Sequence, residues 1–181
     1  MGYAGGTSPE PTYRRIGDHT ECFEVDFDPA AVSYEDLLAL FWQSHNPTRP
    51  AYSTQYASLI LTHSEEQLTA ARAGAEDFEQ AVGRKVLTRV EPLRRFYLAE
   101  GYHQKYRLRN DRELMPEFSA MYPDEREFVD STAAARVNGY LDGEGSAARL
   151  AREIDSFGLT DAGQARLTAR VKRSTGFGAL L

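Results

Sequence analysis

The chain has 181 residues, of which 41% are hydrophobic, and its formal net charge is −6. That apolar fraction is enough for a buried core, and the acidic balance argues against a nucleic-acid partner because no basic surplus exists to neutralise phosphates. No apolar run reaches membrane-spanning length and no secretory signal opens the sequence, so we expect a cytoplasmic protein without membrane contact.

Residues 1–110 predict alternating strands and helices. A Gly-rich turn and a proline-containing loop come first, and residues 20–28 then alternate in polarity, as a half-buried strand does. Ser33 predicts a helix N-cap with Asp36 as its capping-box partner, and Ser64 caps a second helix that reaches about Val82. The remaining expected elements are strands over 56–62 and 85–90, an extended piece over 93–97 and a short helix over 102–109.

The pattern changes at residue 114. Short helical stretches are expected over 113–121, 125–141, 146–157 and 160–172. We therefore predict an α+β fold, in which helices pack on a compact mixed sheet within a domain of residues 1–113. Residues 114–181 are expected to form a helical C-terminal extension.

Glu21 begins one face of the first predicted strand, and Cys22 points to the opposite face. The other members of the Glu21 face are apolar: Phe23, Val25 and Phe27. A carboxyl group with such neighbours is expected to be desolvated, which would keep it protonated and able to donate a proton. The alternative from the residues alone is a structural glutamate that pairs with Arg14 or Arg15.

Several motifs occur in a fixed order. They are G-Y-A-G-G-T-x-P-x-P-T-Y over 2–13, G-D-H-T-E over 17–21, S-Y-E-D-L-L-A-L-F-W over 33–42, T-Q-Y-A-S over 54–58 and F-Y-L-A-E-G-Y-H-Q-K-Y over 96–106. Their order and spacing resemble the class A peptide methionine sulfoxide reductases over residues 1 to about 110. The resemblance implies a ferredoxin-like two-layer core.

The resemblance also implies a reaction, the reduction of methionine S-sulfoxide, free or in proteins. In this family a cysteine thiolate attacks the sulfoxide sulfur, the oxygen gains a proton, and a further thiol resolves the sulfenic acid. Protein repair under oxidative stress is the implied role, without a cofactor and with thioredoxin or dithiothreitol as external reductant. The implied site residues are Glu21 as proton donor, Tyr13 and Tyr56 as the phenols that hold the oxygen, and Gln55, His103 and Tyr3 as binding or supporting residues.

The usual nucleophile of the family is not found in this sequence. It stands in a G-C-F-W motif upstream of the Gly-rich turn, and here the sequence begins at that turn. Cys22 is the only cysteine, and strand alternation directs it away from Glu21. We therefore expect the nucleophile upstream of Met1 and not at Cys22. The alternative is an inactive module that binds methionine-sulfoxide peptides or a partner protein.

A metal enzyme is a further alternative, because residues 19–21 match the H-x-E part of a zinc deaminase site. The P-C-x-x-C that completes such a site is absent from the sequence. The four histidines, His19, His45, His63 and His103, have no spacing typical of a ligand set, so we expect no metal.

Overall fold

The computed structural model describes residues 1–177, with side chains up to Arg173. The chain forms two compact units, Met1–Glu100 and Gly101–Leu181. The sequence places this boundary at residue 113 instead. The difference arises because Leu108 is fully buried in the core of the second unit, so residues 101–113 pack with the helices that follow them.

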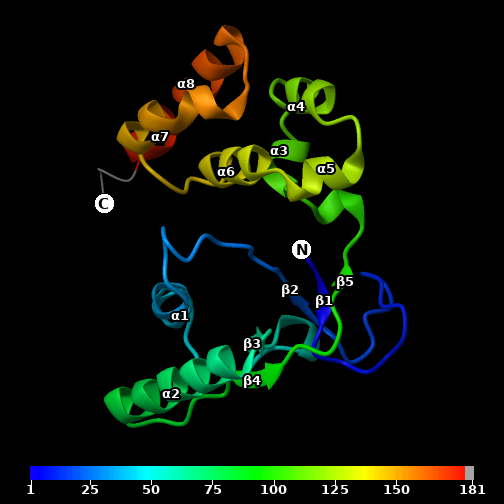
Figure 1. The fold of residues 1–181 in the computed structure, drawn as a ribbon, viewed down its shortest axis with the longest axis vertical. Coiled ribbons are helices and arrows are strands. Elements are labelled where there is room, and N and C mark those ends of the chain that lie inside the picture. Colours follow the sequence, from blue (N-terminus) through cyan, green and yellow to red (C-terminus); the bar gives the residue numbers. More distant parts are fainter. Residues whose placement is uncertain (178–181) are drawn as a thin grey trace. The chain divides into compact units, whose positions relative to one another are not determined.

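The first unit contains two small sheets (Figure 1). One is antiparallel, with strand order β2-β1-β5, and the other is a parallel pair, β3-β4. The strands are β1 (Gly2–Ala4), β2 (Thr20–Cys22), β3 (Leu59–Thr62), β4 (Arg89–Pro92) and β5 (Tyr97–Leu98). The α+β class is confirmed, but the strands are divided between two sheets where one was expected.

The strand β2 is shorter than the alternation of residues 20–28 predicts. It ends at Cys22, and beyond it Phe23 and Val25 are 72% and 50% exposed. The prediction that these side chains form a buried apolar face was wrong. Polarity alternation describes which side chains could share a face, but burial also needs a layer of protein that covers the face.

Two capped helices share a core with the parallel pair, and both were predicted from local signals. Helix α1 (Tyr34–Gln43) begins with a capping box, in which Ser33 and Asp36 each accept a hydrogen bond from the other's backbone N–H. Helix α2 (Glu65–Val82) has Ser64 as its N-cap and Gly83 as its C-cap. The φ of 64° at Gly83 suits a residue without Cβ. These helices and their sheet share a core of Leu38, Trp42, Ile60, Ala71 and Val86.

The remaining turns of the first unit shift two predicted strands. Residues Thr54–Tyr56 form a short 3-10 helix, η1, so β3 begins only at Leu59. The strand expected over 85–90 is β4, which begins at Arg89. Both shifts follow from pairing between distant residues, since β3 and β4 align Leu59 with Arg89.

The second unit is helical. Its elements are η2 (Gly101–His103), α3 (Tyr106–Arg109), α4 (Met115–Met121), α5 (Glu125–Asp130), α6 (Thr132–Leu141), α7 (Ala147–Glu153), η3 (Ile154–Phe157) and α8 (Asp161–Phe177). The helix expected over 125–141 is divided at Ser131, whose hydroxyl caps α6 by accepting from the Ala134 N–H.

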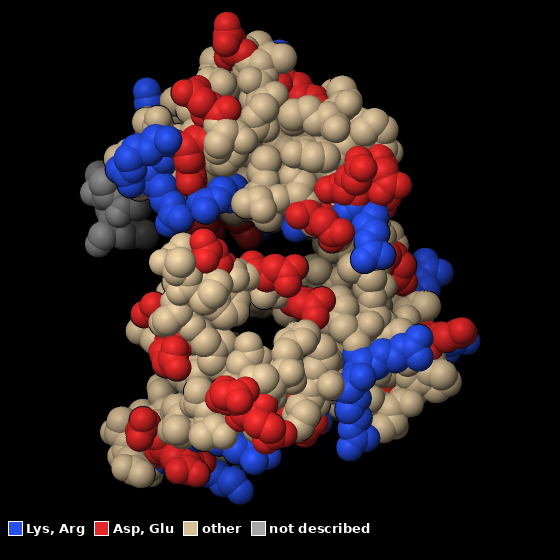
Figure 2. All heavy atoms as spheres, in the orientation of Figure 1, with Lys and Arg blue, Asp and Glu red and all other residues tan. Residues whose placement is uncertain are grey.

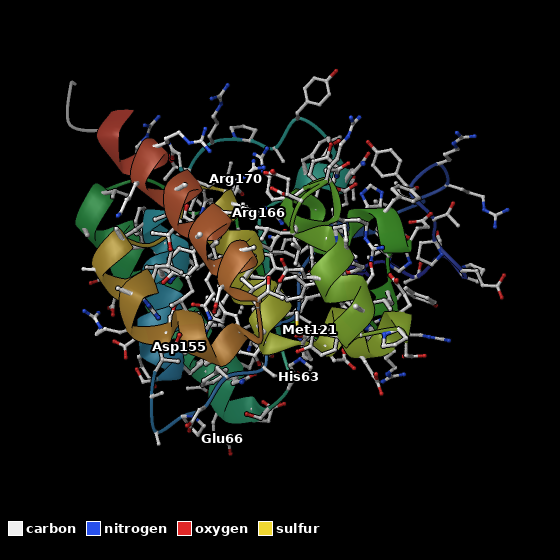
Figure 3. The ribbon with its side chains drawn as sticks, turned by 90° about the horizontal axis from the view of Figure 1, so that it is seen from above. His63, Glu66, Met121, Asp155, Arg166 and Arg170 are labelled. Carbon is white, nitrogen blue, oxygen red and sulfur yellow. The ribbon has the colours of Figure 1, made fainter. Side chains whose placement is uncertain are left out.

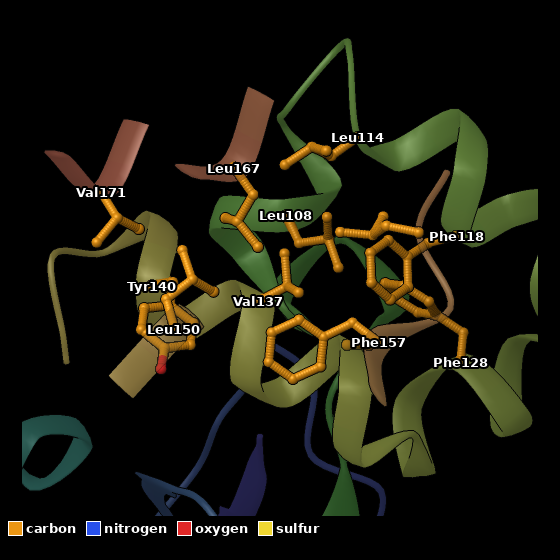
Figure 4. Packing of buried hydrophobic residues seen from close by; sticks show 12 residues of the cluster. Leu108, Leu114, Phe118, Phe128, Val137, Tyr140, Leu150, Phe157, Leu167 and Val171 are labelled. Carbon is orange, nitrogen blue, oxygen red and sulfur yellow. The ribbon is translucent and has the colours of Figure 1, made fainter. Parts of the chain in front are cut away.

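A close-packed core holds these helices together (Figure 4). Leu108, Leu114 and Phe118 from the start of the unit meet Leu167 and Val171 from α8, and all are at most 2% exposed. Ion pairs add to this packing around α8, where Arg166 and Arg170 project from the helix (Figure 3). Arg170 lies 3.1 Å from Asp111 and 2.9 Å from Glu113.

Acidic and basic side chains are interspersed on the face of the molecule drawn in Figure 2. Among the helices that the structure describes, none is both long enough and apolar enough to cross a bilayer.

Candidate active site

Glu21 lies on β2, directly opposite Tyr3 of β1 in the antiparallel register. Its Oε1 accepts a hydrogen bond of 2.7 Å from the side-chain amide of Gln55. The backbone that carries Gln55 is held against β2, because the Thr20 hydroxyl donates to the Thr54 carbonyl at 2.8 Å. The side chain of Glu21 is therefore fixed through one oxygen, and Oε2 is left for other contacts.

The Tyr56 phenol lies near this carboxyl group, and the Tyr13 phenol lies next to Tyr56. The pKa of Tyr56 is raised, chiefly because the Tyr13 phenol lies next to it, and further by desolvation, by the Glu21 carboxylate and by a hydrogen bond with Tyr13. Tyr13 and Tyr56 are 42% and 56% exposed. The structure thus groups Tyr13, Glu21, Gln55 and Tyr56 at one accessible place, although they come from three separate segments.

A rigid turn forms the base of the loop that carries Tyr13. The Asp18 carboxylate accepts hydrogen bonds from Ser8 and Thr7, and these bonds hold its pKa well below the ordinary range. The Gly6 N–H donates to Nδ1 of buried His19, whose Nε2 lies 2.7 Å from the Ser8 carbonyl. A Cβ at Gly6 would come within 2.8 Å of the backbone of residues 18 and 19, so this close approach requires glycine.

The contacts of this turn also determine the tautomer of His19. Gly6 donates to Nδ1, so the ring proton of His19 is on Nε2, where it can be donated to the Ser8 carbonyl. Both ring nitrogens are therefore committed to backbone groups. Within residues 1–177, His, Cys, Asp and Glu side chains nowhere gather in a group of three or more that could hold a metal ion.

Tyr3 and Glu100 connect the sheet to the loop. The buried Tyr3 hydroxyl donates to Oε2 of Glu100 at 2.7 Å, and Oε1 of Glu100 accepts from the Tyr13 N–H at 3.1 Å. Tyr3 was expected to support the site, whereas Glu100 was not singled out from the sequence. Its only signal there is its place in the F-Y-L-A-E-G-Y-H-Q-K-Y motif, next to Gly101.

His103, the other expected supporting residue, belongs to the second unit. It lies in η2, where its ring contacts that of Tyr102 with centroids 4.3 Å apart. The loop carrying Tyr13 and the strand carrying Glu21 belong to the first unit.

Cys22 is half-buried on β2, opposite Gly2 in the register, and its Sγ lies 3.8 Å from the Gly2 carbonyl. Burial raises the pKa of its thiol to about 11. Only a thiolate is a strong sulfur nucleophile, and a group with this pKa is almost entirely protonated at neutral pH.

An apolar cavity of about 510 Å³ lies next to Glu21 and Cys22. Its walls are residues 20–25, helix α1 and strand β3. Within their sheets, β2 and β3 are both edge strands. Residues of both edge strands and the exposed Phe23 and Val25 therefore line one cavity in the first unit.

Comparison with known proteins shows the family of the chain. A model of the peptide methionine sulfoxide reductase family matches residues 1–136. The chain belongs to this family. The family prediction is therefore confirmed, and the match extends beyond residue 110 into the helical unit.

Relatives with this family name are found in animals and plants. A peptide methionine sulfoxide reductase of Drosophila melanogaster is 42% identical over 163 residues, which are 88% of this chain and 65% of the relative. Peptide methionine sulfoxide reductase A5 of Oryza sativa is 38% identical over 147 residues, or 77% of this chain and 57% of the relative. The chain thus spans less than two thirds of the length of either relative.

Among solved structures, the fold is similar to that of Mxr1 from Saccharomyces cerevisiae in its reduced form. The TM-score is 0.55 at 32% sequence identity, and the match covers 60% of this chain and 68% of that protein.

Proposed function

We propose that this chain carries the proton-donating and oxygen-holding part of a site that reduces methionine S-sulfoxide, free or in proteins. The observation that carries the proposal is the Tyr56 phenol near the Glu21 carboxyl, with the Tyr13 phenol next to Tyr56 and with Gln55 bonded to one oxygen of Glu21. Neutral phenol donors suit a sulfoxide, whose oxygen is polar but carries no full charge. Family membership points to the same substrate.

The proposed reaction starts with a thiolate that attacks the sulfoxide sulfur. The S–O bond of the substrate breaks, the oxygen moves to the thiol sulfur, and the oxygen takes up one proton. The products are methionine, reduced by two electrons, and a sulfenic acid, oxidised by two. Glu21 supplies the proton through Oε2, because Oε1 is engaged by Gln55. Tyr13 and Tyr56 hold the oxygen by donating their O–H groups.

The attacking thiol comes from outside this sequence in this proposal. Cys22 is the only cysteine, and the raised pKa of its thiol makes it a poor nucleophile. A second thiol would condense with the sulfenic acid to form a disulfide and water, and a thioredoxin-like dithiol would then reduce that disulfide. A cytoplasmic location fits this requirement, because thiols are kept reduced there.

The test compares this chain with a version extended at its N-terminus by a G-C-F-W segment of the family. Both are incubated with dithiothreitol and either the S or the R epimer of N-acetylmethionine sulfoxide. Turnover of the S epimer is expected from the extended version alone. Glu21→Gln in that version should lower kcat by about 100-fold or more, the size expected for a lost general acid.

Glu24→Gln is the matched control, since this carboxylate lies three residues away and pairs with His63 at 3.3 Å. It should leave kcat within about twofold, as exposed ion pairs contribute little. Turnover by the unextended chain that disappears with Cys22→Ser would overturn the assignment of the thiol. Equal loss of activity in both glutamate variants would overturn the role of Glu21.

A further inference from the structure

We propose that Glu100 is a positioning residue, which holds Tyr13 beside Tyr56 and Glu21 by tying the loop to the sheet. The inference rests on the proposed role of Tyr13 in holding the sulfoxide oxygen. The Glu100 carboxylate accepts hydrogen bonds from the Tyr13 N–H and from the Tyr3 hydroxyl. It acts through the backbone of Tyr13 and through the side chain of Tyr3.

The backbone of Glu100 is well placed for this task. It follows β5, and the preceding residue continues the sheet pairing, because the Ala99 N–H donates to the Met1 carbonyl at 3.1 Å. The side chain therefore starts from a fixed point at the end of the sheet. Its carboxylate then accepts at both oxygens, one bond from each of two segments that lie more than 80 residues away in sequence.

The loop that carries Tyr13 is also fixed at its base. Asp18 and His19 fix residues 6–8, and a local turn joins Thr12 and Arg15. Between these points Glu10 adopts a φ of 47°, a conformation that costs a non-glycine residue about 1 kcal/mol or more. The bond from Tyr13 to Glu100 links the exposed part of the loop to the sheet.

The hydrogen bond from Tyr3 also links Glu100 to the strand that pairs with the Glu21 strand. Tyr3 lies opposite Glu21 in the strand register, and its hydroxyl fixes Oε2 of Glu100. The positions of Glu21 and of Tyr13 are thereby both fixed relative to the strands β1 and β2. Loss of the Glu100 carboxylate should leave Glu21 in place and release Tyr13.

The first arm of the test needs no substrate. In the full 181-residue chain, Tyr56 is titrated by NMR of its phenol carbon, because the neighbouring Tyr13 is the largest cause of its raised pKa. In Glu100→Ala the pKa of Tyr56 should fall toward the ordinary value, and hydrogen exchange at the Tyr13 amide should accelerate about tenfold, as expected for a lost bond. Glu100→Gln keeps one acceptor oxygen and should restore part of both signals.

The second arm measures binding of N-acetylmethionine S-sulfoxide to the same chain. Glu100→Ala should weaken binding about fivefold to tenfold, but it should have no further effect in a Tyr13→Phe background, because the proposed effect of Glu100 on binding is to position that phenol. Additive losses in the double variant, or a Tyr56 titration unchanged by Glu100→Ala, would overturn the proposal. A wild-type chain that binds neither epimer would instead refute the proposed function, while the titration would still decide whether Glu100 positions Tyr13.

Discussion

The two units are held together by different kinds of interaction. In the second unit the packed side chains carry the structure, and Phe118, Val137 and Leu167 are fully buried. In the first unit the core under α1 and α2 is small, and large apolar side chains such as Phe23 and Leu40 are 72% and 67% exposed. There, side-chain hydrogen bonds to backbone hold the loops. Polar contacts therefore position the candidate site, while burial of apolar surface is concentrated in the helical unit.

The largest expected effect is on the free energy of unfolding, and it tests this contrast between the two units directly. Phe118→Ala should destabilise the second unit by about 3–5 kcal/mol, because it leaves a cavity in a closed core. Phe23→Ala, the matched change of an exposed phenylalanine, should alter the free energy of unfolding by less than about 0.5 kcal/mol. Urea denaturation followed by the NMR signals of each unit measures both. Equal losses would show that the exposed side chain is buried in solution.

An intermediate effect on stability is expected at Gly6, where two parts of the loop lie close together. Gly6→Ala places a Cβ within 2.8 Å of backbone at residues 18 and 19, so we expect a cost of about 1–3 kcal/mol from the forced displacement. The displacement should also perturb the NMR signals of Tyr13. Gly139→Ala on α6 is the control, since its Cβ would meet only Glu144 at 3.9 Å.

That control should be neutral or stabilising by up to about 1 kcal/mol, because alanine favours a helix interior. Thermal melts of both variants are compared with the wild type. A harmless Gly6→Ala would mean that the turn is looser than its contacts indicate.

The smallest effect concerns the exposed carboxylate of Asp18. Its folded pKa is lowered by the bonds from Ser8 and Thr7, so the stability that it contributes is present above the unfolded value of about 3.8 and is lost as the pH falls through the folded value. Asp18→Asn should therefore lower the melting temperature slightly at pH 7 and reduce its decline between pH 4 and pH 2. Asp26→Asn, in the segment after β2, is the comparison variant, and an equal change of the melting curve in both variants would contradict the role of the Asp18 bonds.

Local signals predicted the capped helices well and the strands poorly. Ser33 and Ser64 lie next to the backbone groups that they cap, so α1 and α2 begin where the sequence indicates, and α2 ends at Val82 as expected. The strand over 20–28 ends early because its length depends on pairing partners far away in sequence. Two sheets in place of one have the same cause.

The same distinction between local and distant signals applies to the residues of the candidate site. Tyr13, Glu21, Gln55 and Tyr56 could be named from motif order, and the structure brings them together. Glu100 could not be named, because its importance lies in bonds across 87 and 97 residues, which no local pattern reveals. The exposure of Phe23 and Val25 could not be predicted either, since alternation does not tell which faces are covered.

The raised pKa of Cys22 has a practical consequence for the chemistry of oxidation. At pH 7 a thiol with a pKa of about 11 is ionised in roughly one molecule in ten thousand, so peroxide and alkylating reagents should react with it very slowly. Any cysteine of ordinary reactivity added to the chain would then be modified first. Slow reaction of Cys22 with a reagent such as iodoacetamide would agree with this raised pKa.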